Sequence, residues 1–391
     1  MNLQKKKLVI VNQDVGYLFI DLANRALEQY DDVVLVSGSV IELGTSLDPR
    51  VKVVRVTRYR RSSMLARLVT WVIGVLQILV LLSTRFRRHD VILSSNPPLN
   101  SLLSLLVGNK MGLFVLDLYP EALHKTGMVS ERSIIVRLWG RLNASAYRRF
   151  RVIWALTPSM KTAIEEYGVH VTHAPAWASD FANDLDPDFL EQERLKDAWI
   201  VLYSGNLGRE HELECLLDCA AGLADHDSLL FVIAGEGWKK KTLQERIAVE
   251  GLKNVRLLSK LPAPAFTSLL RHSRIGVVTQ SARTADICIP SKTFNLLASG
   301  LPILGIGQPD SDFGILINGS ASGRVFLPEQ TSEMIQFISA CWNDDSAMQQ
   351  LRQNSQETAH TFTKQNAAVM IDQFVNLEKS ALDQTERPVT D

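Results

Sequence analysis

The sequence IPSKTFNLLASGLPIL, residues 289–304, decides the fold assignment. Pro290 fixes the entry to this stretch, and Ser291 is a typical N-cap residue for a helix. Gly300 and Pro302 end the helix before an apolar run that predicts a buried strand. The stretch therefore predicts a loop, a short and sharply bounded helix, and a strand of a sheet.

Polar side chains gather at the start of this predicted helix. Ser291 and Thr293 supply hydroxyl groups, and Lys292 supplies an ammonium group. The helix N-terminus adds free backbone N–H groups and the positive end of the helix dipole. Together these groups predict a phosphate site. The alternative is an ordinary capped helix that packs on a sheet, so the rest of the chain must decide between the two.

Length and composition indicate a globular protein with two cores. The chain has 391 residues, of which 46% are hydrophobic and 21% are charged. Lys5–Lys7 precede an apolar run that is too short for a secretory signal. The cysteines show no metal-binding spacing, and we expect buried free thiols in a reducing compartment; they are Cys215, Cys219, Cys288 and Cys341.

Charge is distributed unevenly although the net charge is zero. Residues 1–180 carry 23 Lys and Arg against 14 Asp and Glu, an excess of 9 positive charges, and residues 181–391 carry the opposite excess. Residues 51–89 contain nine basic side chains and no acidic one, and residues 132–161 are also basic and free of acids. This asymmetry predicts an anionic partner for the first half, and the acidic second half argues against nucleic acid around the whole molecule.

Apolar runs alternate with helical stretches along both halves, as in doubly wound parallel sheets. The predicted strands of the first half are Leu8–Val11, Val33–Val36, Val51–Val56, Asp90–Leu93 and Leu113–Asp117. A second series begins at Trp199 and comprises Ile200–Tyr203, Leu229–Ala234, Val255–Leu258 and Ile275–Val278. We expect a domain over 1–178, a linker over 179–198, a second domain over 199–380 whose last helices cross back, and a disordered tail over 381–391.

The predicted linker is polar and contains Asp184, Asp186 and Asp188. Alternating aspartates can bind a divalent ion, but this run lacks the glycine and the terminal glutamate of a calcium loop. A solvated linker is therefore the preferred interpretation.

The segment 68–82 is apolar except for Thr70 and Gln77. As a helix it would be about 22 Å long, which is shorter than the roughly 30 Å hydrocarbon core of a bilayer. It could span a membrane, lie buried in the domain, or lie in the plane of one leaflet. Arginines at both ends favour the last alternative, because they can hold anionic head groups.

Three motifs of the second half, in this order, resemble the retaining glycosyltransferases of family 4, especially bacterial enzymes that build capsule, exopolysaccharide and O-antigen units. They are Ser204–Arg209 (SGNLGR), Ala234–Gly237 (AGEG) and Pro290–Pro302. Asp117–Leu123 (DLYPEAL) and Ala176–Ala178 (AWA) are similar to motifs of the first domain in that family. The resemblance implies the GT-B fold, an α/β architecture of two Rossmann-like, doubly wound domains that face each other across a cleft.

The resemblance also implies the reaction, which is transfer of a sugar from a nucleotide donor to an acceptor hydroxyl with retention of configuration. UDP-glucose is the favoured donor. No cofactor and no metal are expected, so Lys292 and Arg209 would stabilise the leaving diphosphate. The resemblance implies a donor site made of Gly205, Asn206, Arg209, Glu236, Pro290, Ser291, Lys292, Thr293 and Asn295. For Arg209 alone, a solvent-facing loop residue remains the alternative.

The chain departs from the family at one place. The family commonly has two glutamates eight positions apart, and here these positions carry Ile287 and Asn295, with Asp286 beside the first. Asn295 can still hydrogen-bond a ribose without a charge, and Asp286 could serve the sugar hydroxyls. The departure leaves the donor sugar open.

In the first domain the resemblance places Gly16 under the diphosphate, where a residue without a side chain allows close backbone approach. Asp117 lies where open α/β sheets bind ligands and is expected to orient the acceptor or act as a base; helix capping before Pro120 is the alternative. The expected partners are a UDP-sugar, a lipid-linked saccharide acceptor and an anionic membrane surface, without nucleic acid. The expected location is the cytoplasmic face of the cell membrane. A degenerate nucleotide-sugar sensor or scaffold and a GT-B sugar-nucleotide epimerase remain as alternatives.

Overall fold

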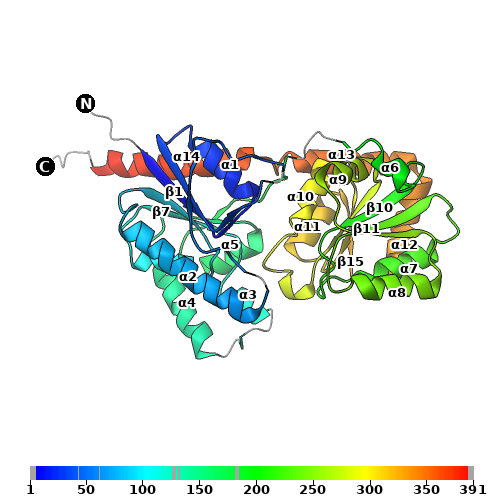
Figure 1. The fold of residues 1–391 in the computed structure, drawn as a ribbon, viewed down its shortest axis with the longest axis horizontal. Helices are drawn as coiled ribbons and strands as arrows, with labels where there is room; N and C mark the ends of the chain where they lie inside the picture. Colours follow the sequence, from blue (N-terminus) through cyan, green and yellow to red (C-terminus); the bar gives the residue numbers. More distant parts are fainter. Residues whose placement is uncertain are drawn as a thin grey trace. The chain divides into compact units, whose positions relative to one another are not determined.

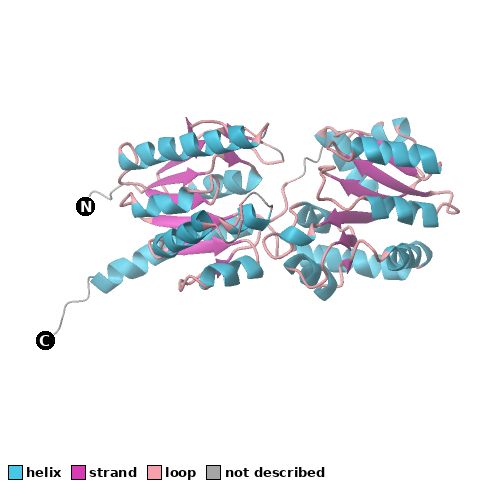
Figure 2. Ribbon diagram, turned by 90° about the horizontal axis from the view of Figure 1, so that it is seen from below, coloured by secondary structure: helices cyan, strands magenta, loops and turns pink. Residues whose placement is uncertain are grey.

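The computed structural model describes residues 6–42, 44–60, 62–125, 129–130, 133–180 and 185–385. The chain forms two compact units. Unit 1 comprises residues 1–179 and 364–391, and unit 2 comprises residues 180–363. Each unit contains a parallel sheet with helices packed on it (Figures 1 and 2).

The sheet of unit 1 has seven strands in the order β5-β3-β1-β6-β7-β8-β9. Its strands are β1 (Lys7–Val11), β3 (Asp32–Ser37), β5 (Lys52–Arg55), β6 (Asp90–Ser94), β7 (Met111–Val115), β8 (Val152–Ala155) and β9 (Thr172–His173). A separate pair is formed by β2 (Asp14–Val15) and β4 (Ser39–Val40). The central strands are continuous apolar runs because helices cover both faces of a parallel sheet, and the predicted strands of this half are confirmed.

Helices α1 (Tyr17–Ala26) and α14 (Gln365–Thr385) pack against each other on one face of this sheet (Figure 1). The Phe19 ring lies 5.6 Å from that of Phe114, and the Phe374 ring lies 6.1 Å from that of Trp154. These aromatic contacts form the centre of the unit 1 core. The remaining helices of the unit are α2 (Met64–Ser83), the 3-10 helix η1 (Asn100–Leu105), α3 (Glu121–Lys125), α4 (Ile134–Tyr147) and α5 (Pro158–Glu165).

The sheet of unit 2 has six strands in the order β12-β11-β10-β13-β14-β15. The strands are β10 (Trp199–Ser204), β11 (Leu229–Ala234), β12 (Val255–Leu258), β13 (Ile275–Thr279), β14 (Ile303–Ile306) and β15 (Gly323–Phe326). The helices are α6 (Phe189–Gln192), α7 (Glu214–Gly222), α8 (Lys240–Glu250), α9 (Ala263–His272), η2 (Ala282–Thr284), α10 (Lys292–Ala298), α11 (Asp312–Gly319), α12 (Thr331–Asn343) and α13 (Asp345–Ala359). The predicted short helix and buried strand are α10 and β14. Gly300 ends the helix with a left-handed φ of +66°.

The structure corrects the predicted linker at 179–198. The backbone N–H of Asp186 donates to Ser268 Oγ, 2.9 Å away. Phe189 and Leu195 are 6% and 0% exposed, because apolar side chains gain from burial and α6 packs on α9 of unit 2. Residues 185–198 are therefore part of unit 2, and residues 181–184, which include Asp184, lie outside the described residues.

The structure also moves the end of the second domain from residue 380 to residue 363. Helix α14 crosses back and belongs to unit 1, where its Phe374 is 3% exposed. Of the predicted tail over 381–391, residues 381–385 continue α14, and residues 386–391 lie outside the described residues.

Helix α2 is longer than the predicted apolar segment and starts at Met64, where the hydroxyl of Ser63 accepts a hydrogen bond from Ala66 N at 3.1 Å. Its 20 residues make it long and apolar enough to cross a membrane by length and composition. Only Thr70, Gly74, Val75, Ile78 and Leu82 are buried. The alternative of a fully buried domain helix is therefore wrong.

Candidate functional site

Two glycine loops meet at the carboxyl ends of β10 and β11. Ser204 pairs with Ala234 at the ends of these strands, and the N–H of Gly205 donates to Ala234 O at 3.0 Å. Gly205 has φ +152°, which favours glycine, and a Cβ on Gly235 would collide with the Gly205 carbonyl oxygen. The two predicted glycine loops therefore lie in direct contact, at the edge where open α/β sheets bind ligands.

Lys292 lies against the first of these loops. Its Nζ is 3.9 Å from the centre of the Tyr203 ring, and a Cβ on Gly205 would lie 2.6 Å from the same atom. Nζ is buried and has no hydrogen-bond partner among the residues that the structure describes. Burial lowers the pKa of this ammonium group to about 8. A buried cation whose only described contact is an aromatic face is well suited to bind an anion.

Thr293 adds a second polar group without a partner at the start of α10. It is 0% exposed, and its Oγ1 makes no hydrogen bond within the described part of the chain. Its N–H donates to Pro290 O at 2.9 Å, so the first turn of the helix already begins there. Lys292 Nζ and Thr293 Oγ1 are thus two buried polar atoms of α10 whose hydrogen-bonding capacity is unused within the described residues.

Ser291 is the N-cap residue of α10, as predicted, but it does not cap the helix with its side chain. It has the helical angles φ −59° and ψ −26°, and its side chain makes no capping hydrogen bond. A side-chain cap requires extended angles at the cap residue, and the Pro290 carbonyl already accepts from Thr293. Ser291 is exposed, which leaves its hydroxyl on the surface beside Lys292.

The sequence analysis did not identify Tyr203 and His211 as site residues. The Tyr203 hydroxyl donates to Asn206 O at 2.8 Å and thereby fixes the glycine loop above its own ring. His211 Nδ1 lies 2.7 Å from Thr279 Oγ1, at the end of β13. Burial, followed by the charges of Lys292 and Lys239, lowers the pKa of His211, so its imidazole is neutral at pH 7 and can donate or accept a hydrogen bond. Their position within and beside the glycine loop was the only signal in the sequence.

Glu236 and Arg209 have contacts of their own. The Glu236 carboxylate accepts a hydrogen bond from Lys240 Nζ at 2.7 Å, and this bond is the main reason that the pKa of Glu236 is lowered. The Glu236 carbonyl accepts from Leu207 N at 2.8 Å, which joins the two glycine loops. The Arg209 guanidinium lies 4.4 Å from the centre of the exposed Trp238 ring. The described contacts therefore place Lys292, and not Arg209, against Gly205.

The positions of the missing glutamates lie beside α10. Asn295 is half-buried on this helix, and Asp286 is exposed after η2. Ile287 is 8% exposed and packs inward. Gln280 Nε2 donates to Cys288 O at 2.6 Å and holds this loop to the end of β13. Of the three, Asp286 and Asn295 keep polar groups near the surface, whereas Ile287 contributes only to packing.

The two predicted site residues of unit 1 lie at carboxyl ends of its strands. Gly16 is the N-cap residue of α1, and a Cβ there would meet no atom within 4 Å, so the space above its backbone is open. Asp117 is exposed two residues after β7, and its N–H donates to Ser95 Oγ at 3.0 Å. Both positions suit ligand contacts within unit 1.

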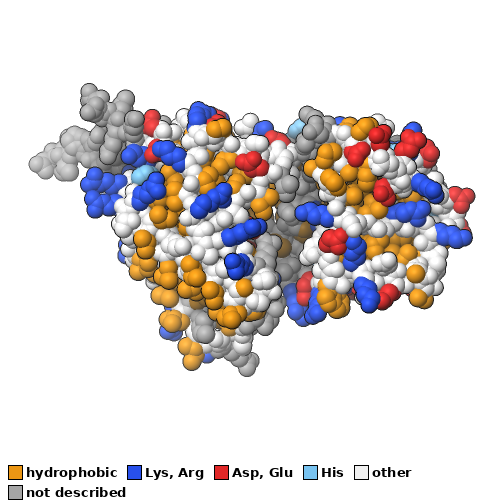
Figure 3. Space-filling view, viewed as in Figure 1, with side chains coloured by type: hydrophobic (Ala, Val, Ile, Leu, Met, Phe, Trp, Pro, Cys, Tyr) orange, Lys and Arg blue, Asp and Glu red, His pale blue; other side chains and the backbone are white. Residues whose placement is uncertain are grey.

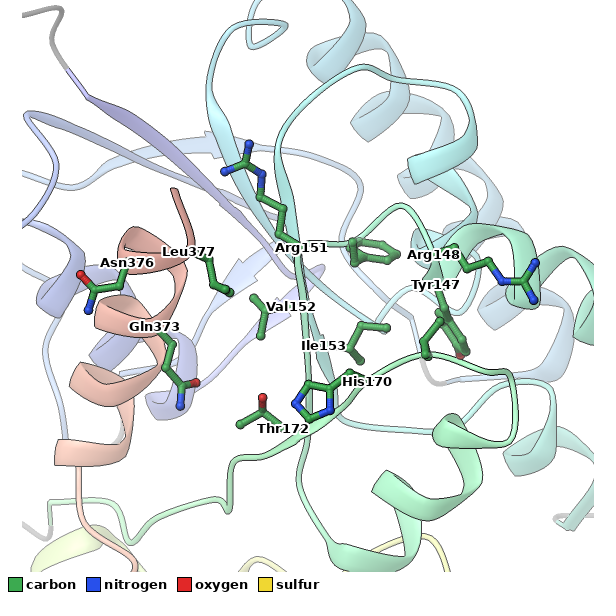
Figure 4. A pocket seen from close by; sticks show the side chains of 12 residues that line it. Tyr147, Arg148, Arg151, Val152, Ile153, His170, Thr172, Gln373, Asn376 and Leu377 are labelled. Atoms are coloured by element: carbon green, nitrogen blue, oxygen red, sulfur yellow. The ribbon is translucent and has the colours of Figure 1, made fainter. Parts of the chain in front are cut away.

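A separate pocket of about 760 Å³ lies elsewhere in unit 1. Gln373 and Asn376 of α14 line it together with Val152 and Thr172 (Figure 4). Val152 and Thr172 are the first residues of their strands, so this pocket is at the opposite edge of the sheet from Asp117. No group of three or more His, Cys, Asp or Glu side chains that could hold a metal ion occurs in the described ranges.

The chain is similar to glycosyltransferases in sequence. Residues 186–358 match the family model described as "Glycosyl transferases group 1". The putative colanic acid biosynthesis glycosyl transferase WcaI of Escherichia coli is 29% identical over 210 residues, which are 51% of this chain and 51% of that protein. The probable glycosyltransferase WbjE of Pseudomonas aeruginosa is 24% identical over 279 residues, which are 68% of this chain and 69% of that protein. The first of these matches thus spans about half the length of the relative.

Solved structures show the same fold over almost the whole chain. The crystal structure of HepE from Anabaena in complex with UDP and glucose has a TM-score of 0.68 at 16% identity, and the match covers 96% of this chain and 100% of that chain. At this identity the likeness shows the fold alone. The predicted GT-B architecture, with parallel sheets in two Rossmann-like halves, is confirmed.

Proposed function

We propose that the protein transfers a hexose from a UDP-sugar to a saccharide acceptor. The proposal starts from the match of residues 186–358 to the group 1 glycosyl transferases and from the GT-B fold of the chain. The reaction belongs to bacterial surface polysaccharide synthesis, proceeds with retention of configuration and needs no metal, as in family 4. The favoured donor is UDP-glucose, and the favoured acceptor is a lipid-linked saccharide.

The observation that carries the donor site is the buried Nζ of Lys292, which lies beside Gly205 and has no hydrogen-bond partner among the described residues. Taking an ammonium group out of water without a counter-ion is costly, and a diphosphate is the ligand that removes this cost. Diphosphate oxygens could accept hydrogen bonds from Lys292 Nζ and Thr293 Oγ1 while the glycine loop lets them approach the backbone.

In the proposed reaction these groups stabilise charge that develops on the leaving diphosphate. They take the role that a metal ion has in other transferases, so the protein contributes position and electrostatics without a covalent nucleophile. Asp117 orients the acceptor hydroxyl, and the departing phosphate takes up its proton. Within unit 1, the open space above the Gly16 backbone would admit a phosphate group.

The relatives support the choice of donor and process. HepE binds UDP and glucose, and WcaI bears a name that refers to colanic acid biosynthesis. The basic and acid-free stretches of unit 1 support an anionic membrane as the place where a lipid-linked acceptor is met. The proposed location is the cytoplasmic face of the cell membrane.

A second candidate function is that of a nucleotide-sugar sensor or scaffold. Asn295 and Ile287 occupy the positions where the family commonly has glutamates, so a protein that binds the donor without transferring the sugar also suits this site.

Calorimetric titration with UDP, UDP-glucose and UDP-N-acetylglucosamine in the presence of EDTA tests the proposal. Binding of UDP and of one sugar donor without metal is the expected result. Release of UDP from that donor in the presence of lipid-linked saccharides from a bacterial membrane extract would then support transfer. Binding without UDP release favours the scaffold, and no binding of any nucleotide overturns the donor site.

A further inference from the structure

Helix α2 exposes a large apolar surface. The exposed side chains are Met64, Leu65, Leu68, Val69, Val72, Ile73, Leu76 and Val80, with exposed fractions from 40% to 70%. Of the most apolar 18 residues of this helix, only 22% are buried. Contiguous apolar surface of this extent on a protein marks an interaction site.

Helix α4 extends this surface. Ile134, Leu138 and Leu142 are spaced by four residues and therefore lie on one side of the helix. Their exposed fractions are 77%, 55% and 38%. Figure 3 shows hydrophobic side chains gathered over α2 and α4 on the same face of unit 1. We name these eleven side chains of the two helices the α2–α4 face.

A row of four aromatic rings ties the two helices together. Tyr59 stacks on Trp71 of α2 at 5.5 Å between ring centres, and Trp71 meets Tyr119 edge to face at 6.5 Å. Tyr119 in turn stacks on Trp139 of α4 at 6.2 Å. Such pairs add to the energy of burial and fix geometry, so the α2–α4 face is one surface and not two independent helices.

The sequence stretches that carry the two helices are basic. Helix α2 lies within the acid-free stretch 51–89, and α4 lies within the acid-free stretch 132–161. Among the described residues, the exposed arginines of these two stretches are Arg55, Arg58, Arg60, Arg85, Arg87, Arg88, Arg137, Arg141, Arg148, Arg149 and Arg151. Apolar side chains bordered by cations and free of nearby acids in the sequence are complementary to a leaflet that contains anionic lipids.

The inner side of α2 is fixed to the sheet of unit 1. Gln13 Nε2 donates to Thr70 O at 2.7 Å, and a Cβ on Gly74 would lie 2.5 Å from the same nitrogen. Ile78 and Leu82 are 0% and 1% exposed. A helix that crossed the bilayer would have to leave these contacts and expose the sheet, so the fold favours a helix that stays attached and lies in the membrane plane.

We propose that the α2–α4 face inserts into one leaflet of an anionic membrane, with α2 parallel to the membrane plane and the arginines at the head groups. This inference rests on the association with an anionic membrane included in the proposed function, and adds the surface that docks, including its second helix, α4. The α2–α4 face binds a lipid surface; α2 does not span the membrane, and the face does not bind a second copy of the chain. The face belongs to unit 1 alone, so docking does not need the donor site of unit 2.

Flotation with lipid vesicles tests the proposal on the full chain. We expect the wild-type protein to float with vesicles of phosphatidylcholine and phosphatidylglycerol at low salt, and much less with phosphatidylcholine alone. Leu68→Glu combined with Leu76→Glu should reduce flotation at least fivefold, because charged side chains do not enter the leaflet. The matched control is Val249→Glu in α8, where the side chain is 87% exposed, and it should float like the wild type.

Further measurements distinguish in-plane binding to an anionic leaflet from a transmembrane span and from a dimer. Arg137→Glu with Arg141→Glu should weaken flotation with anionic vesicles and reduce its dependence on salt. Alkaline carbonate should release the wild-type protein from cell membranes; retention overturns the in-plane arrangement. If the wild-type protein does not float with vesicles but forms a dimer, and the leucine substitutions abolish this dimer, the proposal is overturned. The face would then bind a second copy of the chain.

The same variants separate this inference from the proposed donor site. UDP titration of the doubly substituted leucine variant should give the wild-type affinity, which also shows that it is folded. Flotation without UDP binding in the wild type would overturn the donor site and leave the docking face standing. UDP binding without flotation would overturn the docking face and support the donor site.

Discussion

Lys292 Nζ lies 3.9 Å above the ring of Tyr203 and has no hydrogen-bond partner among the described residues. The aromatic face stabilises the cation only partly. The contact also holds the ammonium group at the glycine loop after β10, where a diphosphate could reach it. Stability and ligand binding therefore make opposite demands on this side chain.

Replacing Lys292 by Met should separate these two demands. We expect UDP affinity to fall roughly 10- to 100-fold, because a charge-assisted hydrogen bond is lost. The free energy of unfolding without ligand should rise by about 1 to 3 kcal/mol, because a buried cation without a partner is removed. Calorimetry and urea unfolding measure the two effects. A variant that is less stable and binds UDP normally would show that Lys292 is a structural residue.

Binding of UDP should take up protons near pH 8. The pKa of Lys292 is lowered by burial to about 8, and a bound diphosphate raises it again. The complex then holds a proton that the free protein has partly lost, so affinity falls as pH rises through 8. Calorimetry at pH 8 in two buffers with different ionisation enthalpies should show uptake of about half a proton. Lys292→Met should show none; equal uptake in both proteins would assign the proton to another group.

The same shift has a consequence for the free protein. Because the folded pKa of Lys292 is below its ordinary value, the unfolded chain keeps the proton between pH 8 and roughly 10.4. The contribution of Lys292 to the free energy of unfolding therefore rises with pH across this interval. A comparison of wild type with Lys292→Met at pH 7 and pH 9.5 measures it, and the gain from the substitution should shrink at the higher pH.

Gly205→Ala should damage the donor site. The new Cβ would lie 2.6 Å from Lys292 Nζ at a residue with φ +152°. We expect a loss of roughly 1 to 3 kcal/mol in the free energy of unfolding and at least a tenfold loss of UDP affinity. Gly319→Ala is the control in the same unit, because a Cβ there meets no atom within 4 Å. Unchanged UDP binding in Gly205→Ala would place the diphosphate elsewhere.

Asp117→Asn should affect transfer and spare donor binding. The carboxylate is exposed beyond β7 and is proposed to orient the acceptor hydroxyl. We expect a fall in acceptor-dependent UDP release of 100-fold or more, on the order of a lost acid–base or orienting group. UDP affinity by calorimetry should stay within twofold. Normal turnover would leave Asp117 with the alternative role of a helix-capping residue before Pro120.

Local signals were sufficient for α10 and β14. Pro290 and Gly300 bound the helix from within a few residues, and the buried strand after it is a continuous apolar run. The N-cap position of Ser291 was predicted correctly, but its side chain makes no capping hydrogen bond, because the Pro290 carbonyl already accepts from Thr293 and Ser291 has helical angles. N-cap propensity is a property of a single residue type, whereas the hydrogen bond that forms at this helix start depends on its neighbours Pro290 and Thr293.

The environment of Lys292 could not be predicted from its own segment. The Tyr203 ring comes from β10, and His211 is linked to Thr279 of β13. These groups meet only because the strands are neighbours in the sheet. The extent of unit 2 was misjudged for a similar reason, since Phe189 and Leu195 are isolated apolar residues that become core only in the folded unit.

Helix α14 has a consequence for the order of folding during synthesis. Unit 1 begins at the N-terminus, but Phe374, which packs on Trp154, is translated after the whole of unit 2. Unit 2 is continuous in sequence and can complete its core on the ribosome, whereas unit 1 must wait with the Trp154 side of its sheet uncovered. Unit 1 is therefore the first to be synthesised and the last to complete its fold. A chaperone would be needed for unit 1 while the rest of the chain is being translated.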